Sequence, residues 1–592
     1  MIITTLNKKI IQCIEELFAS FNIPEEKIQL VLTKKEFEGD ITLVLFPLIQ
    51  FIKKPIHELG DEIGNLLVKK DEFDSFNVVS GFLNLVVSDL HINTLFKNIY
   101  SDSNFGMPDF KDIPHPVSLV EFSSPNTNKP LHLGHIRNIL LGQSISNILE
   151  KRGHSVKKVQ VINDRGIHIC KSMVAWLEFG NGETPETSGI KGDHLVGKYY
   201  VKFDEQYRKE VLDLINQGVS EQEAKKESVI FKKAQQMLVR WEDNDKEVID
   251  PWKTMNSWVY EGFDVTYKNI GVDFDKNYYE SDTYLLGKKV VDIGLEKNVF
   301  YRKEDGSVWI DLSDEGLDEK LILRSDGTTV YITQDIGTAI QRQQDFSFSN
   351  MVYTVANEQD YHFKVLFLIL KKLGYSWADN CYHLSYGMVD LPTGRMKSRE
   401  GTVVDADEFL NEMISTAKSI SKELGKLEGM KEEKAEELYS TIGLGALKYF
   451  MLKIDPKKRM LFDPKESVDF NGNTGPFIQY TYARIQSLVR NYSTKFTLPN
   501  NISISPKEKD IIKNLLDFSN IIDEAAKSFS PAVVANYVYE LVKGFNNYYQ
   551  HTPILKAESE DLIKFRLALS IKVGEVIKRS MKLLGIDVPQ RM

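Results

Sequence analysis

The chain has 592 residues, 42% of them hydrophobic and 27% charged, and a formal net charge of −10. A chain of this length is too long to fold around one hydrophobic core, so we expect three or more domains in a soluble globular protein. The negative net charge argues against a nonspecific nucleic-acid-binding protein, although clustered cations would still serve a specific RNA partner.

Cysteine usage and apolar runs exclude further classes of protein. The three cysteines are isolated, which excludes a zinc-ligand spacing and a disulfide framework. The first 18 residues form an amphipathic pattern with internal glutamates and predict a helix rather than a secretory signal. The apolar run at 41–52 contains Pro47 and is too short to span a bilayer. We therefore expect a cytoplasmic protein with no membrane contact, no zinc and no prosthetic group.

Residues 1–110 predict a small α+β domain. The amphipathic helix is followed by two segments rich in apolar and β-branched residues, 36–55 and 76–92, which indicate strands. Nothing in this part of the chain indicates catalysis, so a packing appendage is one interpretation. Glycine and prolines at 101–116 indicate a linker to the next domain.

Residues 117–163 predict a βαβ unit. An apolar strand begins at 117, a loop of Ser, Pro and Asn follows, and a helix begins at the tetrad His-Leu-Gly-His, residues 132–135. A second apolar strand covers 156–163, ending in an Asn-Asp-Arg-Gly turn that reaches Gly166. The first βα loop of such a unit is where parallel sheets bind nucleotides.

The tetrad has residues suited to phosphate chemistry. The start of a helix offers free backbone N–H groups and a partial positive charge. Gly134 lets a nucleotide lie against the backbone, and His132 and His135 can both donate to phosphate oxygens. When an HxGH motif occurs without other signals, its two histidines more often make ordinary hydrogen bonds within a loop. The strand before it and the helix after it favour a site.

The stretch VEFSSPNTNKPLHLGH, residues 120–135, resembles the first signature of class I aminoacyl-tRNA synthetases as arginyl-tRNA synthetases have it. The resemblance implies a Rossmann-type catalytic domain whose substrates are arginine, ATP with Mg²⁺, and tRNA(Arg). It also implies that arginine activation requires bound tRNA. Magnesium that arrives with ATP needs no dedicated protein cage, so we expect no metal-binding residues.

The next segment, about 170–320, is mostly helical and charged, with short strands near 298–303 and 307–312. It resembles the insertion between the two halves of the class I fold, and we assign it no catalysis. Residues 321–404 then predict the second half of the fold. Tyr331 and Asp335 are four residues apart at the beginning of a helical pattern, which places them on one face.

Five polar residues are expected to converge at the ends of the strands. Their chemistry alone indicates a cationic substrate, because carboxylates match a guanidinium in bidentate fashion. Each position also matches one that the arginyl family uses for arginine. The predicted arginine-binding residues are Glu121, Asn126, Tyr331, Asp335 and Gln359.

A basic loop at 391–404, LPTGRMKSREGTVV, resembles the second class I signature, KMSKS. Aligned on Met396, the two lysine positions hold Arg395 and Ser398, with Lys397 and Arg399 beside them. Arginyl enzymes relax this motif, and a lysine just before HLGH is thought to compensate. Here that residue is Lys129. The alternative interpretation is an ordinary basic surface turn.

Two overlapping sets of residues follow from these motifs. The predicted catalytic residues are Lys129, His132, Gly134, His135, Lys397 and Arg399. The predicted ATP-binding residues are Lys129, His132, His135, Arg395, Met396, Lys397 and Ser398.

The C-terminal third contains a positive segment that the net charge conceals. Residues 471–500 lack Asp and Glu and interleave cations with aromatics, which suits phosphates and unstacked bases. The segment resembles the beginning of the anticodon-binding helical bundle of arginyl enzymes. Tyr480, Arg484 and Arg490 are the predicted tRNA contacts, although many of these tyrosines also suit a helical core.

The complete interpretation is a multidomain α/β protein and an arginine–tRNA ligase. We expect an N-terminal α+β domain (1–110) that contacts tRNA, a Rossmann catalytic domain (111–455) and a helical anticodon-binding domain (456–592), acting as a monomer. The alternatives are a non-catalytic tRNA-binding paralogue, an HxGH small-molecule adenylyltransferase, and a ligase for another amino acid.

Overall fold

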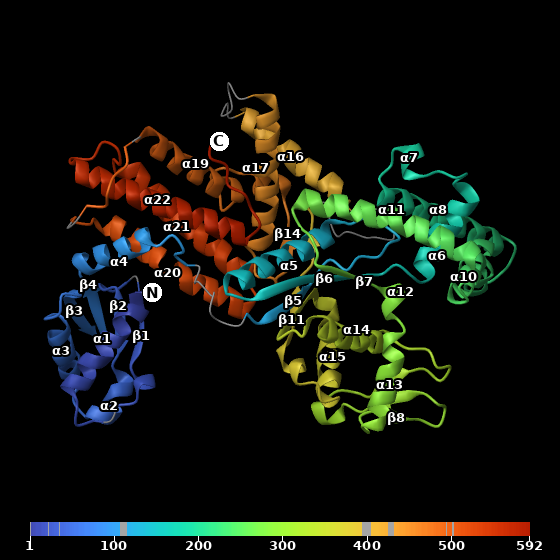
Figure 1. The fold of residues 1–592 in the computed structure, drawn as a ribbon, viewed down its shortest axis with the longest axis horizontal. Helices are drawn as coiled ribbons and strands as arrows, with labels where there is room; N and C mark the ends of the chain where they lie inside the picture. The colour runs from blue at the N-terminus through green and yellow to red at the C-terminus, as the bar shows by residue number, and fades with distance from the viewer. Residues whose placement is uncertain are drawn as a thin grey trace.

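The computed structural model describes residues 2–21, 23–34, 36–106, 115–392, 404–423, 431–492, 494–499 and 502–592. Figure 1 shows an N-terminal unit at one end, a central sheet, a helical insertion at the other end, and a C-terminal bundle above the sheet. Within the described part of the chain, every helix is too short or too polar to cross a lipid bilayer.

The N-terminal unit is a small α+β domain, as predicted, and its sheet is antiparallel. Residues 46–52, inside the segment 36–55 that indicated strand, form a helix instead. The strands follow the order β1-β2-β4-β3. They are β1 (Gln29–Leu32), β2 (Ile41–Val44), β3 (Phe73–Val79) and β4 (Phe82–Val87). The helices are α1 (Ile2–Leu17), α2 (Phe46–Ile52), α3 (Ile56–Leu67) and α4 (Asp89–Ser101). Gly64 lets α3 lie against the sheet, because a Cβ there would be 2.5 Å from the Phe76 ring.

The central sheet has five parallel strands in the order β12-β11-β5-β6-β7. They are β5 (Val117–Glu121), β6 (Ser155–Ile162), β7 (Lys276–Tyr279), β11 (Asn350–Ala356) and β12 (Cys381–Tyr386). The chain leaves β5 toward β6 on one side and returns as β11 on the other. The carboxyl end of β5 is therefore a topological switch point, where such sheets bind ligands.

Helices cover both faces of this sheet. Because side chains alternate along a strand, Val120 packs with α5 (Leu133–Lys151), while Leu119 packs with α14 (Tyr331–Phe346) and α15 (Asp360–Lys372). The two hydrophobic clusters lie on opposite faces of the sheet. The predicted βαβ unit and second half of the fold are confirmed.

The insertion is divided in two by β7. Before β7 lie α6 (Ile167–Phe179), α7 (Pro185–Ser188), α8 (Gly192–Asn216), α9 (Glu221–Glu227), α10 (Val229–Glu242) and α11 (Lys246–Ile270). After it lie α12 (Glu280–Thr283), α13 (Leu286–Glu296), and a small sheet of β8 (Tyr301–Arg302), β9 (Val308–Ile310) and β10 (Lys320–Leu323). The sequence Lys-Asn-Tyr-Tyr of β7 is short and polar, so the sequence pattern did not reveal this edge strand.

The C-terminal helices form one bundle that is joined to the catalytic core. They are α16 (Ala406–Glu423), α17 (Glu432–Leu452), α18 (Pro464–Ser467), α19 (Gly475–Asn491), α20 (Pro506–Ser528), α21 (Pro531–His551) and α22 (Glu560–Leu583). A two-stranded parallel pair, β13 (Val389–Asp390) and β14 (Met460–Leu461), links the sheet region to the bundle. The buried Ser144 hydroxyl of α5 donates to the carbonyl of Leu583 at 2.9 Å.

The N-terminal unit packs on the bundle rather than on the sheet. Figure 1 shows α4 beside α20. The Lys513 ammonium lies 2.6 Å from Asp40 Oδ1, and the Asn93 side chain donates to the carbonyl of Ile502 at 2.7 Å. The bundle therefore contacts both the N-terminal unit and the catalytic core.

Candidate active site

The loop after β5 is held by a buried asparagine of the helix that follows it. Ser123 and Ser124 adopt left-handed backbone conformations, with φ of 68° and 47°. The Asn138 side chain of α5 accepts from the N–H of Ser123 and donates to the carbonyl of Thr354 in β11 at 2.7 Å. This buried bridge fixes the turn that leads to the tetrad.

The two histidines of the tetrad cap the helix that they begin. His132 is the N-cap of α5, and its Nδ1 accepts from the N–H of Gly134 at 3.1 Å. His135 Nδ1 accepts in turn from the N–H of His132 at 3.1 Å. Since each Nδ1 is an acceptor, the proton of each neutral ring is on Nε2. Neither Nε2 atom has a hydrogen-bond partner among the described residues, so both remain available as donors.

Both histidines are neutral near pH 7. Burial lowers the pKa of His132 to about 4, and the ammonium of Lys129 acts in the same direction. Burial also lowers the pKa of His135 well below its usual value, helped by His132 and Lys129. Burial lowers the pKa of Lys129 itself. Neutral Nε2–H donors at a helix start stabilise added negative charge without charged imidazoles.

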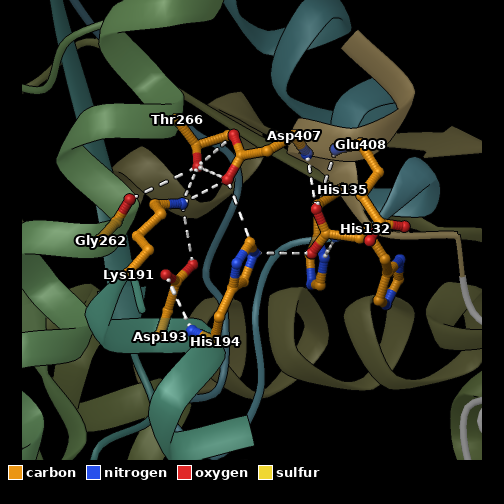
Figure 2. Close-up of polar contacts among 10 residues, drawn as sticks. His132, His135, Lys191, Asp193, His194, Gly262, Thr266, Asp407 and Glu408 are labelled. Atoms are coloured by element: carbon orange, nitrogen blue, oxygen red, sulfur yellow. Dashed lines mark hydrogen bonds and ion pairs between the residues drawn. The ribbon is translucent and has the colours of Figure 1, made fainter. Parts of the chain in front are cut away.

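Gly134 makes room for the first of these rings. A Cβ at this position would lie 3.0 Å from Cε1 of His132, so a larger residue would move the imidazole. The ring centroids of His132 and His135 are 3.9 Å apart (Figure 2). The spacing of the tetrad thus fixes the two rings against each other.

The tetrad pairs with the chain segment just after the basic loop. His132 and Asp405 form an antiparallel bridge, and the N–H of Leu133 donates to the carbonyl of Val404 at 3.2 Å. The N–H of Ala406 donates to the carbonyl of Leu131 at 3.0 Å. Five predicted residues of the basic loop lie outside the described residues: Arg395, Met396, Lys397, Ser398 and Arg399.

Four of the predicted arginine-binding residues lie on loops and helix starts past the strand ends. Asn126 is exposed and bridges to Asn163 beyond β6. Tyr331 begins α14 with 74% of its surface exposed, and Gln359 is exposed just before α15. Asp335 Oδ2 lies 2.6 Å from Nε2 of His362 in α15. This contact joins the first turns of the two helices at the edge predicted for the pocket.

Glu121 has a different partner from the one predicted. Its Oε2 lies 2.5 Å from the guanidinium of Arg342, and its Oε1 accepts from the hydroxyl of Ser124 at 3.0 Å. Arg342 is fully buried, between Tyr278 and Tyr353. This carboxylate therefore pairs with an internal guanidinium, and its contact with arginine stays a prediction.

Glu280, which the sequence did not indicate, is a half-buried carboxylate with no ion pair among the described residues. It begins α12 directly after β7, and its side chain has no hydrogen bond or ion pair among the described residues. Burial raises its pKa to about 7, opposed by Arg165 and reinforced by Asp164 and Asp335. No local pattern marked Glu280, because its neighbours come from distant segments.

The Asn-Asp-Arg-Gly turn after β6 supports the position of Glu280. Asp164 is buried and accepts from the N–H and the hydroxyl of Ser281, at 2.9 and 2.7 Å. Arg165 lies over the Tyr284 ring at 3.9 Å and pairs with Glu242 at 3.0 Å. Both side chains are engaged with other parts of the protein, so the turn fixes the position of α12.

The described residues contain one group with the composition of a metal site, Asp193, His194 and Asp407. The ammonium of Lys191 lies 3.1 Å from Asp193 and 2.5 Å from Asp407, within this group (Figure 2). A lysine that already supplies the positive charge does not fit a resident metal ion.

The predicted tRNA contacts lie on α19, and two of them are engaged within the bundle. Arg484 donates to Oδ1 of Asn546 at 2.6 Å and lies between the rings of Tyr480 and Tyr549. Arg490 is exposed and donates to the carbonyl of Gln590 at 3.0 Å. Arg490 is the more accessible of the two arginines.

Family models match most of the chain. Residues 112–463 match the model described as "tRNA synthetases class I (R), catalytic domain", and residues 478–592 match the "DALR anticodon binding domain". A curated arginine–tRNA ligase of Flavobacterium psychrophilum is 57% identical, with 99% of each chain covered. One of Bacteroides fragilis is 53% identical, with 96% of each covered. The fold is similar to that of Thermus thermophilus arginyl-tRNA synthetase, with a TM-score of 0.80, 24% identity and full coverage of both chains.

Proposed function

This chain belongs to the arginyl-tRNA synthetase family and is an arginine–tRNA ligase, and we propose which of its residues carry each part of the reaction. The α-carboxylate of arginine attacks the α-phosphorus of ATP and displaces pyrophosphate. A ribose hydroxyl of the 3′-terminal adenosine of tRNA then attacks the carbonyl carbon of arginyl-adenylate, which forms the ester and releases AMP. Both steps depend mainly on positioning and on stabilising charge as it moves.

His132 and His135 are proposed to hold the phosphates of ATP. Their Nε2–H groups donate to phosphate oxygens as negative charge moves toward the leaving pyrophosphate, and Lys129 adds an ammonium beside them. Mg²⁺ enters as part of the ATP substrate. The catalytic roles of Lys397 and Arg399, and the ATP contacts of Arg395, Met396 and Ser398, stay predictions from the sequence.

The arginine pocket is proposed to be built around Asp335 and Glu280. The carrying observation is the position of Glu280 at the start of α12, just past the end of β7, where its side chain makes no hydrogen bond or ion pair among the described residues. Beyond burial, Asp164 and Asp335 raise the pKa of this carboxylate and Arg165 lowers it. Two such carboxylates favour a guanidinium between them. Asn126, Tyr331 and Gln359 would fix the remaining polar groups of arginine.

Replacing Asp335 with alanine should raise the KM for arginine about 10- to 100-fold, because a hydrogen bond to a charged group contributes roughly 1.5–3 kcal/mol. The KM for ATP should change little. The measurement is ATP–pyrophosphate exchange with arginine and tRNA present. Asp379→Ala is a matched control, since Asp379 is exposed and pairs with Lys371 on the surface. An unchanged arginine KM would remove Asp335 from the pocket.

The pKa of about 7 at Glu280 predicts a pH dependence of arginine binding. Below pH 7 the free enzyme takes up a proton there and loses the negative charge that attracts arginine. The arginine KM should therefore rise as pH falls below 7, approaching about tenfold per pH unit. Measuring the KM between pH 5.5 and 8.5 tests this expectation. Glu280→Gln should have a high KM that no longer depends on pH in this range, and an unaltered slope in this variant would exclude Glu280 as the titrating group.

The terminal domains are proposed to bind tRNA(Arg). The bundle that matches the anticodon-binding model carries Tyr480, Arg484 and Arg490, and the accessible Arg490 is the best candidate of these for a phosphate contact. The N-terminal unit lies on the same bundle and would contact another part of the same tRNA.

We propose that the protein acts in the cytoplasm. We also propose that it acts as a monomer, because one chain supplies the histidines, the predicted arginine-binding residues and the bundle. The two available Nε2 donors disfavour a non-catalytic paralogue.

A further inference from the structure

A histidine of the insertion reaches the segment that pairs with the tetrad. His194 lies in the first turn of α8, and its Nε2 is 2.9 Å from Oδ2 of Asp405, a residue 211 positions later in the chain. Figure 2 shows His194 on the side of the acidic group that faces His132 and His135. No sequence pattern indicated a connection between the insertion and the catalytic histidines.

Asp405 connects three parts of the protein. Its Oδ1 accepts from the N–H groups of Asp407 and Glu408, at 2.9 and 3.1 Å, and so caps the start of α16. Its Oδ2 meets His194. Its backbone forms the antiparallel bridge with His132. Any movement of Asp405 is therefore passed directly to the backbone of the tetrad.

The charges around His194 stabilise its contact with Asp405. Three carboxylates surround Lys191 and His194. The ammonium of Lys191 lies 3.1 Å from Asp193 and 2.5 Å from Asp407, while Nε2 of His194 lies 2.9 Å from Asp405 and 3.7 Å from Asp407. One lysine does not neutralise three carboxylates, so a second cation at His194 would bring the net charge of the group closer to zero. The hydrogen bond to Asp405 raises the pKa of His194, and burial acts in the opposite direction. The hydroxyl of Thr266 in α11 binds Lys191 and Asp407 and ties the group to a second insertion helix.

Close packing leaves α8 little freedom to move away. A Cβ at Gly197 would lie 2.8 Å from Cδ of Pro130, two residues before the tetrad. A Cβ at Gly262 of α11 would lie 2.4 Å from Oδ1 of Asp193. The first turns of α8 are thus held between α11 and the loop that leads to His132.

We propose that His194 is a positioning residue for arginine activation, which holds Asp405 against the Leu131–Leu133 segment and so keeps His132 and His135 aligned with the ATP phosphates. The inference rests on the proposed role of the two histidines. His194 itself touches no reacting atom. It acts through the side chain of Asp405 and the backbone pairing of that residue with the tetrad.

The test separates ATP kinetics from arginine kinetics. His194→Ala should lower kcat/KM for ATP about 10-fold or more in ATP–pyrophosphate exchange, because small misplacements of catalytic groups are costly. The KM for arginine should stay within about 2-fold. His194→Gln, whose amide can still donate to Asp405, should recover most of the loss. Lys198→Ala is the matched control on the same helix, since Lys198 is half-exposed and pairs with Glu183 away from the tetrad.

A second variant keeps the test decisive if His194→Ala does not fold. Asp405→Ser retains an oxygen that can cap α16 but cannot reach His194. It should show the same ATP-specific loss, and a folded double variant should lose no more than either single variant. Unchanged ATP kinetics, an equal rise in both KM values, or a glutamine variant as impaired as the alanine variant would overturn the proposal. His135→Ala tests the underlying role of the histidines separately.

Discussion

Replacing His135 with alanine should lower the turnover number in ATP–pyrophosphate exchange about 100- to 1000-fold, the usual cost of losing one donor that stabilises transition-state charge. The KM for arginine should change little, because His135 lies at the helix start and not among the pocket carboxylates. The expected loss follows from the Nε2–H that the ring directs away from its Nδ1 contact with the N–H of His132.

The capping role of His135 needs its own control. His135→Asn offers a side-chain acceptor for the N–H of His132 but no donor at the position of Nε2. If donation to phosphate is the main role, the asparagine variant should be nearly as impaired as the alanine variant. Full recovery by asparagine would assign His135 to capping. Equal losses in turnover and in arginine affinity would also contradict the phosphate role.

Replacing Arg342 with methionine should destabilise the catalytic core by about 3–5 kcal/mol, because it leaves the Glu121 carboxylate buried without a cation. The pair is shielded from water, with 2% of the Arg342 side chain and 11% of the Glu121 side chain exposed. The two tyrosine rings beside the guanidinium lose their contact as well. Urea unfolding followed by circular dichroism measures the change.

The double variant Glu121→Gln, Arg342→Met distinguishes pairing from packing. Removing the charge of Glu121 removes the unpaired carboxylate, so the double variant should regain a large part of the lost stability. The exposed pair Lys371–Asp379 provides a comparison, and breaking it should leave the free energy of unfolding nearly unchanged. A double variant less stable than Arg342→Met would show that packing dominates at this position.

The sequence predicted those helices and strands that can be recognised from the hydrophobic pattern of a short stretch of residues. The apolar strands around the tetrad, the helix that the tetrad begins and the helical C-terminal third all follow from periodicity over short windows. β7 was missed because it has only four residues and begins with Lys-Asn, so it shows no hydrophobic periodicity. Its place at the edge of the sheet is determined by pairing with β6.

The site was predicted less completely than the fold, because charge pairing is a tertiary property. Glu121 lies at the end of a strand, and its ion-pair partner Arg342 lies 221 residues later, so no local pattern indicated this pair. Glu280 lies on a four-residue helix, and only its neighbours across the fold reveal a carboxylate that lacks a cation. His194 lies in the insertion, to which the sequence analysis assigned no catalysis, and its contact with Asp405 depends on how α8 meets the start of α16.

The contact between α5 and the end of α22 also bears on how the protein is made. Ser144 is synthesised 439 residues before Leu583, whose carbonyl accepts from its hydroxyl. At roughly 5–20 residues per second, the ribosome needs about 20–90 s to cover that interval. Throughout this time the face of α5 that the last helix will bury is uncovered. The packing of the helix that begins at the His-Leu-Gly-His tetrad is therefore completed only after the last helix has been synthesised.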